Sequence, residues 1–362
     1  MFGTFTDIEK KILHDERLTR DDGIKLFACN DLSWLGALAD YVRKKKCGDI
    51  VYYNVNCHLN LTNICISRCK FCAFGRDENA KGAYAMTLEQ AIAIIEDALK
   101  DPNMSGLHIV SGLHPMWSFN DYLRFLQVIH EKYPNLYIKG FTGVEIVHFS
   151  KISGLSVEDV LIKLKEAGLQ AIAGGGAEIL SDRVRKLLCP KKATADEWLN
   201  AARTAHKLGI KSNASMLYGH IETLEERVDH LIKLRNLQDE TGGFQTFICF
   251  PFLPKNTQLE REIKQTSMWD DLRTMAISRL MLDNFTNIKA YWIMLTVPVA
   301  QVALNFGAND IDGTIHKETI LHDAGAASPE SLKEDEIIKI ILDIGRTPAA
   351  CDCNFNILRL IK

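Results

Sequence analysis

Between residues 55 and 306, short apolar segments with a two-residue period alternate with longer segments that have helical spacing. The predicted strands lie at 55–61, 107–110, 136–141, 169–173, 210–216, 244–250 and 288–294, and the predicted helices lie at 87–100, 118–132, 156–167, 182–208, 223–239, 269–284 and 297–306. Such alternation indicates a parallel sheet, because parallel strands need crossover connections. About seven units favour a closed barrel over an open sheet, and Pro190 predicts a break within 182–208.

The chain has 362 residues, which suits one α/β barrel with extensions. We predict an N-terminal helical extension at 1–50, a barrel at 51–307 and a C-terminal extension at 308–362 that packs on the barrel. The last of these contains a predicted helix at 332–345. Hydrophobic residues make up 47% of the sequence, which is enough for a large core.

The net charge is −3 and no long basic run is present, so nothing favours binding to nucleic acid or to an anionic membrane. No apolar stretch has the length of a membrane span, and the N-terminus does not resemble a signal peptide. The ten cysteines do not form a pattern typical of a disulfide framework. We therefore expect a cytoplasmic protein that binds neither nucleic acid nor membrane.

Three cysteines, Cys65, Cys69 and Cys72, follow the first predicted strand, and the next cysteine is Cys189. Structural zinc sites and most electron-carrying clusters use four protein ligands. Three thiolates on a tight loop can instead hold three irons of a [4Fe–4S] cluster and leave the fourth iron open to a substrate. The alternatives are a chance group of thiols and a partial zinc site.

Several candidate ligand-binding residues follow predicted strands, where the loops of a parallel barrel carry its functional groups. Gly112 lets the backbone approach a ligand, and Glu145 and Glu178 offer carboxylates that accept hydrogen bonds. Ordinary turns and solvated glutamates are the alternatives, although three preceding glycines favour a function for Glu178. Asn213 lies within a strand and needs a partner if it faces inward. Lys192 is a candidate to pair the carboxylate of a ligand, or belongs to a solvated turn.

Four further side chains could have either a substrate contact or a structural role. Arg279 lies in a largely apolar helical segment and needs a partner, which is either a substrate carboxylate or a structural residue such as Asp283. His58, His148 and Tyr291 are similarly undecided. The pair Cys351 and Cys353 is more typical of free thiols than of a second metal site.

The cysteine spacing, with Phe71 before the last cysteine, resembles the cluster loop of radical S-adenosylmethionine (SAM) enzymes. Longer stretches at 108–115, 145–149, 174–179, 216–223 and 290–294 resemble the aminofutalosine synthases, which are radical SAM enzymes of the futalosine route to menaquinone. The resemblance covers residues 50–325. Ser111 stands where that family often has glycine, and the Cys351–Cys353 pair is not part of the pattern.

The resemblance implies a (β/α)8 TIM-type radical SAM barrel whose three cysteines hold a [4Fe–4S] cluster, with SAM as co-substrate. It implies addition of the 5′-deoxyadenosyl radical to 3-[(1-carboxyvinyl)oxy]benzoate, rearrangement and loss of the carboxyl carbon to form aminodeoxyfutalosine. An electron donor such as flavodoxin or ferredoxin is a further implied partner. The expected SAM-binding residues are Phe71, Gly112, His114, Glu145, Glu178, Lys192, Asn213, Gly219 and Glu222. The candidate catalytic residues, which come from the sequence itself, are Arg279, His148 and Tyr291.

Two other readings of the sequence stay open. A sister enzyme shares the loop and barrel but abstracts hydrogen and cyclises dehypoxanthine futalosine. A non-enzymatic iron–sulfur carrier or a zinc-binding scaffold is a rival of a different class. The carrier predicts that SAM is not cleaved, and the zinc scaffold predicts a colourless protein.

Overall fold

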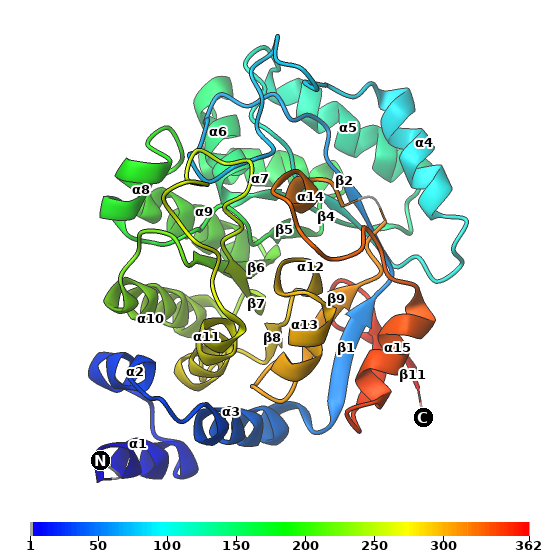
Figure 1. The fold of residues 1–362 in the computed structure, drawn as a ribbon. Coiled ribbons are helices and arrows are strands. Elements are labelled where there is room, and N and C mark those ends of the chain that lie inside the picture. Colours follow the sequence, from blue (N-terminus) through cyan, green and yellow to red (C-terminus); the bar gives the residue numbers. More distant parts are fainter. Residues whose placement is uncertain (1–2, 317, 362) are drawn as a thin grey trace.

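The computed structural model describes residues 3–316 and 318–361, which form one eleven-stranded sheet surrounded by helices (Figure 1). The strand order is β11-β10-β1-β9-β8-β7-β6-β5-β4-β3-β2, and every pair except β10/β11 is parallel. The strands are β1 (Ile50–Asn54), β2 (Asn56–Leu59), β3 (Gly106–Ile109), β4 (Tyr137–Thr142), β5 (Ala171–Ala173), β6 (Lys211–Tyr218), β7 (Phe244–Pro251), β8 (Asn287–Lys289), β9 (Asp310–Gly313), β10 (Thr347–Cys351) and β11 (Ile357–Leu360).

Only Val55 separates β1 from β2 in the chain, although β2 is the last strand at one end of the sheet and β1 lies between β10 and β9 near the other end. β1 pairs with β9, whereas β2 pairs with β3. Backbone N–H groups of 314 and 316 bind carbonyls of 54 and 56, and the N–H of Ser105 binds the carbonyl of Val55 at 2.8 Å. The parallel strands from β1/β2 to β9 therefore curve around a common interior, which confirms the predicted (β/α)8-type barrel.

Helices cover the outside of this sheet, and most begin at a capping residue. Thr87, Thr194 and Thr223 each cap a helix through the side-chain oxygen and form a capping box with the residue three positions later. The helices are α1 (Gly3–Leu13), α2 (Arg20–Phe27), α3 (Leu32–Cys47), α4 (Leu88–Ala98), α5 (Phe119–Lys132), α6 (Gly143–Ser153), α7 (Val157–Glu166), α8 (Asp182–Leu188), α9 (Ala195–Lys207), α10 (Leu224–Thr241), α11 (Met268–Met281), α12 (Trp292–Leu295), α13 (Val297–Ala303), α14 (Ile320–Asp323) and α15 (Glu334–Leu342).

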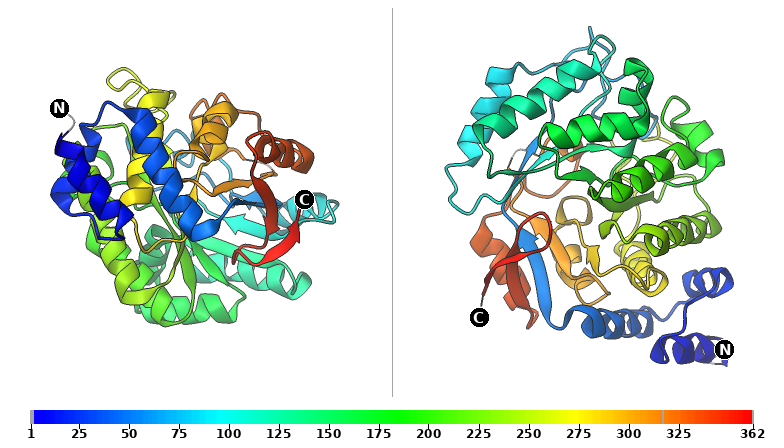
Figure 2. Two further views of the ribbon diagram at one scale, coloured as in Figure 1. Left: turned by 90° about the horizontal axis from the view of Figure 1, so that it is seen from below. Right: turned by 180° about the vertical axis from the view of Figure 1, so that it is seen from behind.

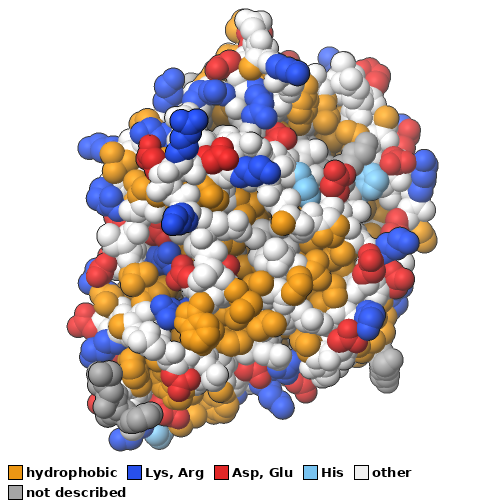
Figure 3. All heavy atoms as spheres, in the orientation of Figure 1, with side chains coloured by type: hydrophobic (Ala, Val, Ile, Leu, Met, Phe, Trp, Pro, Cys, Tyr) orange, Lys and Arg blue, Asp and Glu red, His pale blue; other side chains and the backbone are white. Residues whose placement is uncertain are grey.

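The N-terminal and C-terminal segments pack on different parts of the barrel (Figure 2). Helices α2 and α3 lie against α10 and α11, and α15 lies against β10 beside β1. On the face shown in Figure 3, hydrophobic side chains gather at the centre and in the lower half, and basic side chains are interspersed with acidic ones. Among the described residues, no helix has the length and apolar character needed to span a membrane.

The structure departs from the predicted elements in several places. β1 (Ile50–Asn54) was not predicted, since the first strand was expected at 55–61, and β10 and β11 were not predicted either. β9 lies in the region assigned to the C-terminal extension, because its sequence Asp310–Gly313 lacks an apolar pattern although it is buried. α6 was not predicted, and the strand expected at 288–294 ends at Lys289. The break predicted near Pro190 is confirmed, since α8 ends at Leu188.

Candidate functional site

A cavity of about 360 Å³ runs from the carboxyl ends of the strands into the barrel interior. It collects most of the predicted site residues from seven separate parts of the chain. These residues are Cys65, Cys69, Phe71, Cys72, Gly112, Glu145, Glu178, Lys192, Asn213 and Tyr291. This is where a parallel barrel concentrates its functional side chains.

The cysteine loop follows β2 and is fixed by backbone hydrogen bonds to the loop after β3 and to the end of α8. The N–H of Ile66 donates to the carbonyl of Leu113 at 3.0 Å, and the N–H of Lys70 donates to that of Leu188 at 2.8 Å. Within the loop, the N–H of Gly75 donates to Sγ of Cys72 at 3.3 Å. The loop therefore holds its thiols at the wall of the cavity.

The donor set suits a cluster better than a single ion. Among the described residues, no three His, Cys, Asp or Glu side chains converge on a point where they could hold one metal ion. Zinc needs such convergence, whereas a [4Fe–4S] cluster distributes its thiolates over different irons. Hydrogen bonds to cluster sulfurs, such as the one that Gly75 directs at Cys72, are a normal feature of iron–sulfur sites. The three-cysteine loop thus fits a [4Fe–4S] cluster.

A fourth thiol near this loop was not predicted. Cys189 lies just after α8 and forms a hydrogen bond with Cys69, which lowers the pKa of Cys189 to about 7. The two residues are far apart in sequence, and no local pattern links them. Cys189 does not line the cavity.

Glu145 connects the ends of β3 and β4. It is the third residue of α6, where it completes a capping box with Thr142, and it is not in a loop as we had expected. Its Oε2 accepts the N–H of Thr142 at 2.7 Å, and its Oε1 accepts the N–H of Ser111 at 3.0 Å. Burial raises the pKa of Glu145 to about 7 against these hydrogen bonds. The carboxylate therefore positions the Ser111–Gly112 turn.

Gly112 lies where that turn crosses the cysteine loop. A Cβ atom at this position would lie 2.5 Å from the carbonyl oxygen of Ile64 and 3.1 Å from that of Thr62. Any side chain here would push the cysteine loop outward, so close backbone approach is the reason for glycine.

Lys192 joins three parts of the site. It forms an ion pair with Glu178, and its Nζ lies 5.2 Å from the centre of the Phe71 ring. Burial alone would lower the pKa of Lys192, but the charges of Glu178 and the neighbouring thiols outweigh burial and raise it. Lys192 is thus a buried cation at the wall next to the cysteine loop.

The cavity is also lined by polar residues and a thiol for which no site role was predicted, apart from His58, which was undecided. They are Asn54, Asn56, His58, His108, Lys139, Lys289, Asp312, Glu318 and Cys353. Lys139, on β4, and Lys289, on β8, are both buried. A polar residue inside a segment with strand periodicity is the signal that could have found them, as it did for Asn213.

The two interior lysines differ in their partners. Lys289 forms ion pairs with Asp312 and, at 3.5 Å, with Asp310, and these carboxylates raise its pKa against the effect of burial. Lys139 donates to Oδ1 of Asn213 at 3.3 Å, and burial lowers its pKa.

Arg279 requires a correction, because it does not line the cavity. Its side chain is fully buried and donates to the carbonyls of Gly307, Phe285 and Thr286 and to Oδ1 of Asn309, at 2.7–3.2 Å. These acceptors lie in the segments before β8 and β9. Arg279 therefore joins α11 to these segments and does not face the cavity.

The two histidines expected at the site also lie outside the cavity. His114 stacks on Trp117 with ring centres 4.8 Å apart, and its Nδ1 accepts the N–H of Met116. His148 lies on α6 beside Phe149. Both predictions rested on the residue type next to a strand end, which does not determine the direction of the side chain.

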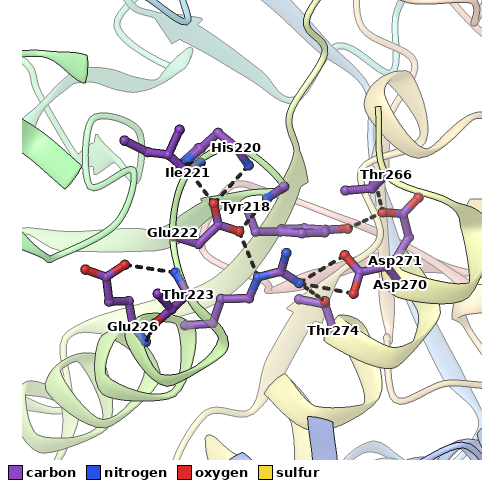
Figure 4. Close-up of polar contacts among 12 residues, drawn as sticks. Tyr218, His220, Ile221, Glu222, Thr223, Glu226, Thr266, Asp270, Asp271 and Thr274 are labelled. Atoms are coloured by element: carbon purple, nitrogen blue, oxygen red, sulfur yellow. Dashed lines mark hydrogen bonds and ion pairs between the residues drawn. The ribbon is translucent and has the colours of Figure 1, made fainter. Parts of the chain in front are cut away.

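Gly219 and Glu222 were expected to bind SAM, but Glu222 belongs to a network of polar contacts around the turn after β6 (Figure 4). Glu222 accepts the N–H groups of Gly219 and His220 at 2.6 and 2.9 Å and pairs with Arg227 at 2.8 Å. Burial would raise the pKa of Glu222, but His220 and Arg227 lower it to about 2. This carboxylate holds the turn after β6, and neither residue lines the cavity.

Comparison with protein families gives two adjoining matches. Residues 59–234 match the radical SAM superfamily, and residues 241–361 match the CofH/MqnC C-terminal region. Together they cover the chain from the end of β2 to residue 361, apart from residues 235–240.

Curated relatives match over nearly the whole chain. An aminodeoxyfutalosine synthase of Thermus thermophilus is 44% identical over 356 residues, which are 98% of this chain and 95% of that protein. A 5-amino-6-(D-ribitylamino)uracil–L-tyrosine 4-hydroxyphenyl transferase of Archaeoglobus fulgidus is 40% identical, over 89% of this chain and 92% of that protein. The crystal structure of methylornithine synthase has a TM-score of 0.76 at 20% identity, covering 94% and 97% of the two chains, and shares the fold.

Proposed function

The chain belongs to the radical SAM superfamily, and from that premise we propose that it forms aminodeoxyfutalosine from SAM and 3-[(1-carboxyvinyl)oxy]benzoate. In this reaction the 5′-deoxyadenosyl radical adds to the enol double bond, the aryl group migrates and the carboxyl carbon is lost. SAM is consumed as a co-substrate. The relative from Thermus thermophilus, which is similar over 98% of the chain, supports this choice.

Cys65, Cys69 and Cys72 would hold the [4Fe–4S] cluster, which when bound supplies the electron that cleaves SAM. The protein's own residues would position the reactants. Phe71 lies on the cysteine loop with Lys192 beside it, and the turn at Gly112, which Glu145 fixes, contacts the segment just before Cys65. These groups are candidates to bind SAM at the mouth of the cavity. Enclosure by the barrel would keep water and stray hydrogen donors away from a radical.

The observation that supports this substrate best is the buried polar interior of the same cavity. The proposed substrate carries two carboxylates, and Lys139, Lys289 and Asn213 place cationic and amide groups there. Addition of the radical needs the enol carbon within roughly 3–3.5 Å of C5′, so the substrate must be held at more than one point.

Two other reactions have support. The match of residues 241–361 to the CofH/MqnC C-terminal region favours a related enzyme, of which a cyclase of dehypoxanthine futalosine is one candidate. The relative from Archaeoglobus fulgidus, at 40% identity, favours transfer of a 4-hydroxyphenyl group from L-tyrosine. A flavodoxin or ferredoxin is the proposed electron donor in each case.

One assay separates the three reactions. The protein is reconstituted anaerobically with iron and sulfide and given a chemical reductant, SAM labelled in its adenosine part, and each substrate in turn. We expect the label in an adenosyl adduct with 3-[(1-carboxyvinyl)oxy]benzoate. Label found only in free 5′-deoxyadenosine, together with a cyclised futalosine or a 4-hydroxyphenyl-transfer product, contradicts the proposal and identifies the alternative.

A further inference from the structure

Lys139 is a buried cation in the middle of the barrel. It lies on β4 in register with His108 on β3, which pairs in turn with His58 on β2. Only 8% of Lys139 is exposed, yet the residue lines the cavity. A charged side chain in this position is normally paired, because burying an isolated charge is costly.

Among the described residues, Lys139 forms no ion pair of its own, although Asp310 and Asp312 act on its charge from farther away. In the described part of the chain, no carboxylate lies within 4.0 Å of its Nζ, and its hydrogen bond goes to the neutral amide of Asn213 at 3.3 Å. Lys289 differs from Lys139 in this respect, since Asp312 and Asp310 both lie within ion-pair distance of its Nζ. The barrel thus neutralises one interior lysine and leaves the other to face the cavity.

His108, in register with Lys139, has a ring nitrogen that makes no hydrogen bond with the described residues. Its Nε2 is buried without a hydrogen-bond partner in the described residues, and its Nδ1 lies 3.4 Å from Nε2 of His58. Burial strongly lowers the pKa of His108, so the ring is neutral. If His58 donates to Nδ1, then Nε2 of His108 carries a proton and is a donor.

We propose that Lys139 binds a carboxylate of the substrate, with Asn213 and His108 beside it as hydrogen-bonding neighbours. Resting on the proposed function, this assigns the carboxylate on the benzoate ring. The enol carbon must reach C5′ of SAM near the cysteine loop, at the mouth of the cavity. The ring then points toward the interior, where Lys139 would meet its carboxylate. Lys139 would therefore be a specificity-determining residue that selects an aryl carboxylate.

The test compares two substrates in the reconstituted enzyme. One is 3-[(1-carboxyvinyl)oxy]benzoate, and the other is the same enol ether without the ring carboxylate. A charge-assisted hydrogen bond of this kind corresponds to about 10- to 100-fold in affinity. We expect Lys139→Met to raise KM for the dicarboxylate by about that factor and to leave KM for the monocarboxylate close to that of the wild type.

Two further variants accompany Lys139→Met. One perturbs the same site without removing the lysine, and the other removes a lysine outside the cavity. Asn213→Asp keeps Lys139 but places a carboxylate beside it, so it should cause the same selective loss. Lys211→Met removes an exposed lysine from the start of β6 and should leave both KM values unchanged. Cluster content and SAM cleavage without substrate show whether each variant is intact. An equal loss on both substrates, or no loss on either, overturns the assignment.

A binding measurement keeps the inference separate from the proposed reaction. Binding of 3-hydroxybenzoate to the reconstituted protein is measured by calorimetry for the wild type and Lys139→Met. If the wild type does not convert the dicarboxylate but binds 3-hydroxybenzoate more than about 10-fold tighter than Lys139→Met, the proposed reaction fails and the aryl carboxylate site stands. Equal binding by both proteins contradicts the site, whatever the reaction.

Discussion

The ammonium of Lys192 forms an ion pair with the carboxylate of Glu178, and this pair connects the loop after α8 to the segment after β5. Only 15% and 13% of the two side chains are exposed. Lys192 also lies over the ring of Phe71, so the pair supports the cysteine loop. Removing one partner would leave a buried charge without compensation.

We therefore expect Glu178→Ala to lower the free energy of unfolding by about 3–5 kcal/mol, as measured by chemical denaturation. Glu240→Ala is the matched control, because Glu240 pairs with Arg203 at the surface and such pairs contribute under about 1 kcal/mol. If Lys192→Met/Glu178→Gln is no more stable than Glu178→Ala, the stranded cation is not the cause of the loss.

Cys189 allows a direct test of how many thiolates the cluster uses. Alanine at Cys65, Cys69 or Cys72 should abolish the visible absorbance of the reconstituted protein and its SAM cleavage. Cys189→Ala should keep both, because three ligands leave one iron for SAM although Cys189 contacts Cys69. Cys351→Ala and Cys353→Ala should also keep the cluster. Loss of the cluster in Cys189→Ala would indicate a four-thiolate electron carrier.

Glu145 predicts a pH-dependent stability difference. Burial raises its pKa from 4.5 to about 7 in the folded protein, so the folded state holds a proton that the unfolded state has released. Between these two values stability falls as pH rises, because the unfolded state binds fewer protons. The total effect is on the order of 3 kcal/mol.

Glu145→Gln removes the titrating carboxyl group, so comparing this variant with the wild type at each pH isolates its effect. The free energy of unfolding of Glu145→Gln relative to the wild type should increase by about 3 kcal/mol from pH 4.5 to pH 7, measured without SAM. A constant difference across this range would show that the buried carboxyl keeps its ordinary pKa.

The order of strands and helices could be read from the sequence because apolar periodicity reports which face of each element is buried. The pattern failed at β9, where Asp310 and Asp312 face a polar interior and pair with Lys289. It also failed at α6, whose run of buried residues has no single apolar face.

Local motifs predicted the cysteine loop and the strand-end positions, since these depend on short-range spacing. They could not determine which way His114, His148 or Arg279 points, because packing with distant segments decides it. Lys139 and Cys189 acquire their neighbours only through the closed sheet and the loop after α8. The interior of the site is therefore set by long-range contacts that one sequence does not display.

The C-terminal tail reaches the interior end of the cavity at Cys353. The side chain of Cys353 packs against Gly106, the first residue of β3. A Cβ atom at Gly106 would lie 2.2 Å from Sγ of Cys353 but 3.8 Å from its Cβ. The carbonyl of Cys353 accepts a hydrogen bond from Gln245 at 3.1 Å, which fixes the tail beside β7. A side chain at position 106 would therefore clash with Sγ of Cys353 alone, and the hydrogen bond to the Cys353 carbonyl limits how far that residue can move.

We expect Gly106→Ala to lower the free energy of unfolding by about 1–3 kcal/mol, which is typical of overpacking. Cys353→Ala removes the sulfur and leaves ordinary van der Waals separation, so Gly106→Ala/Cys353→Ala should be no less stable than Cys353→Ala. A double-mutant cycle measures this coupling through the four unfolding free energies. Additive effects of the two substitutions would show that the tail does not contact β3 in solution, and the cavity would then be open at its interior end.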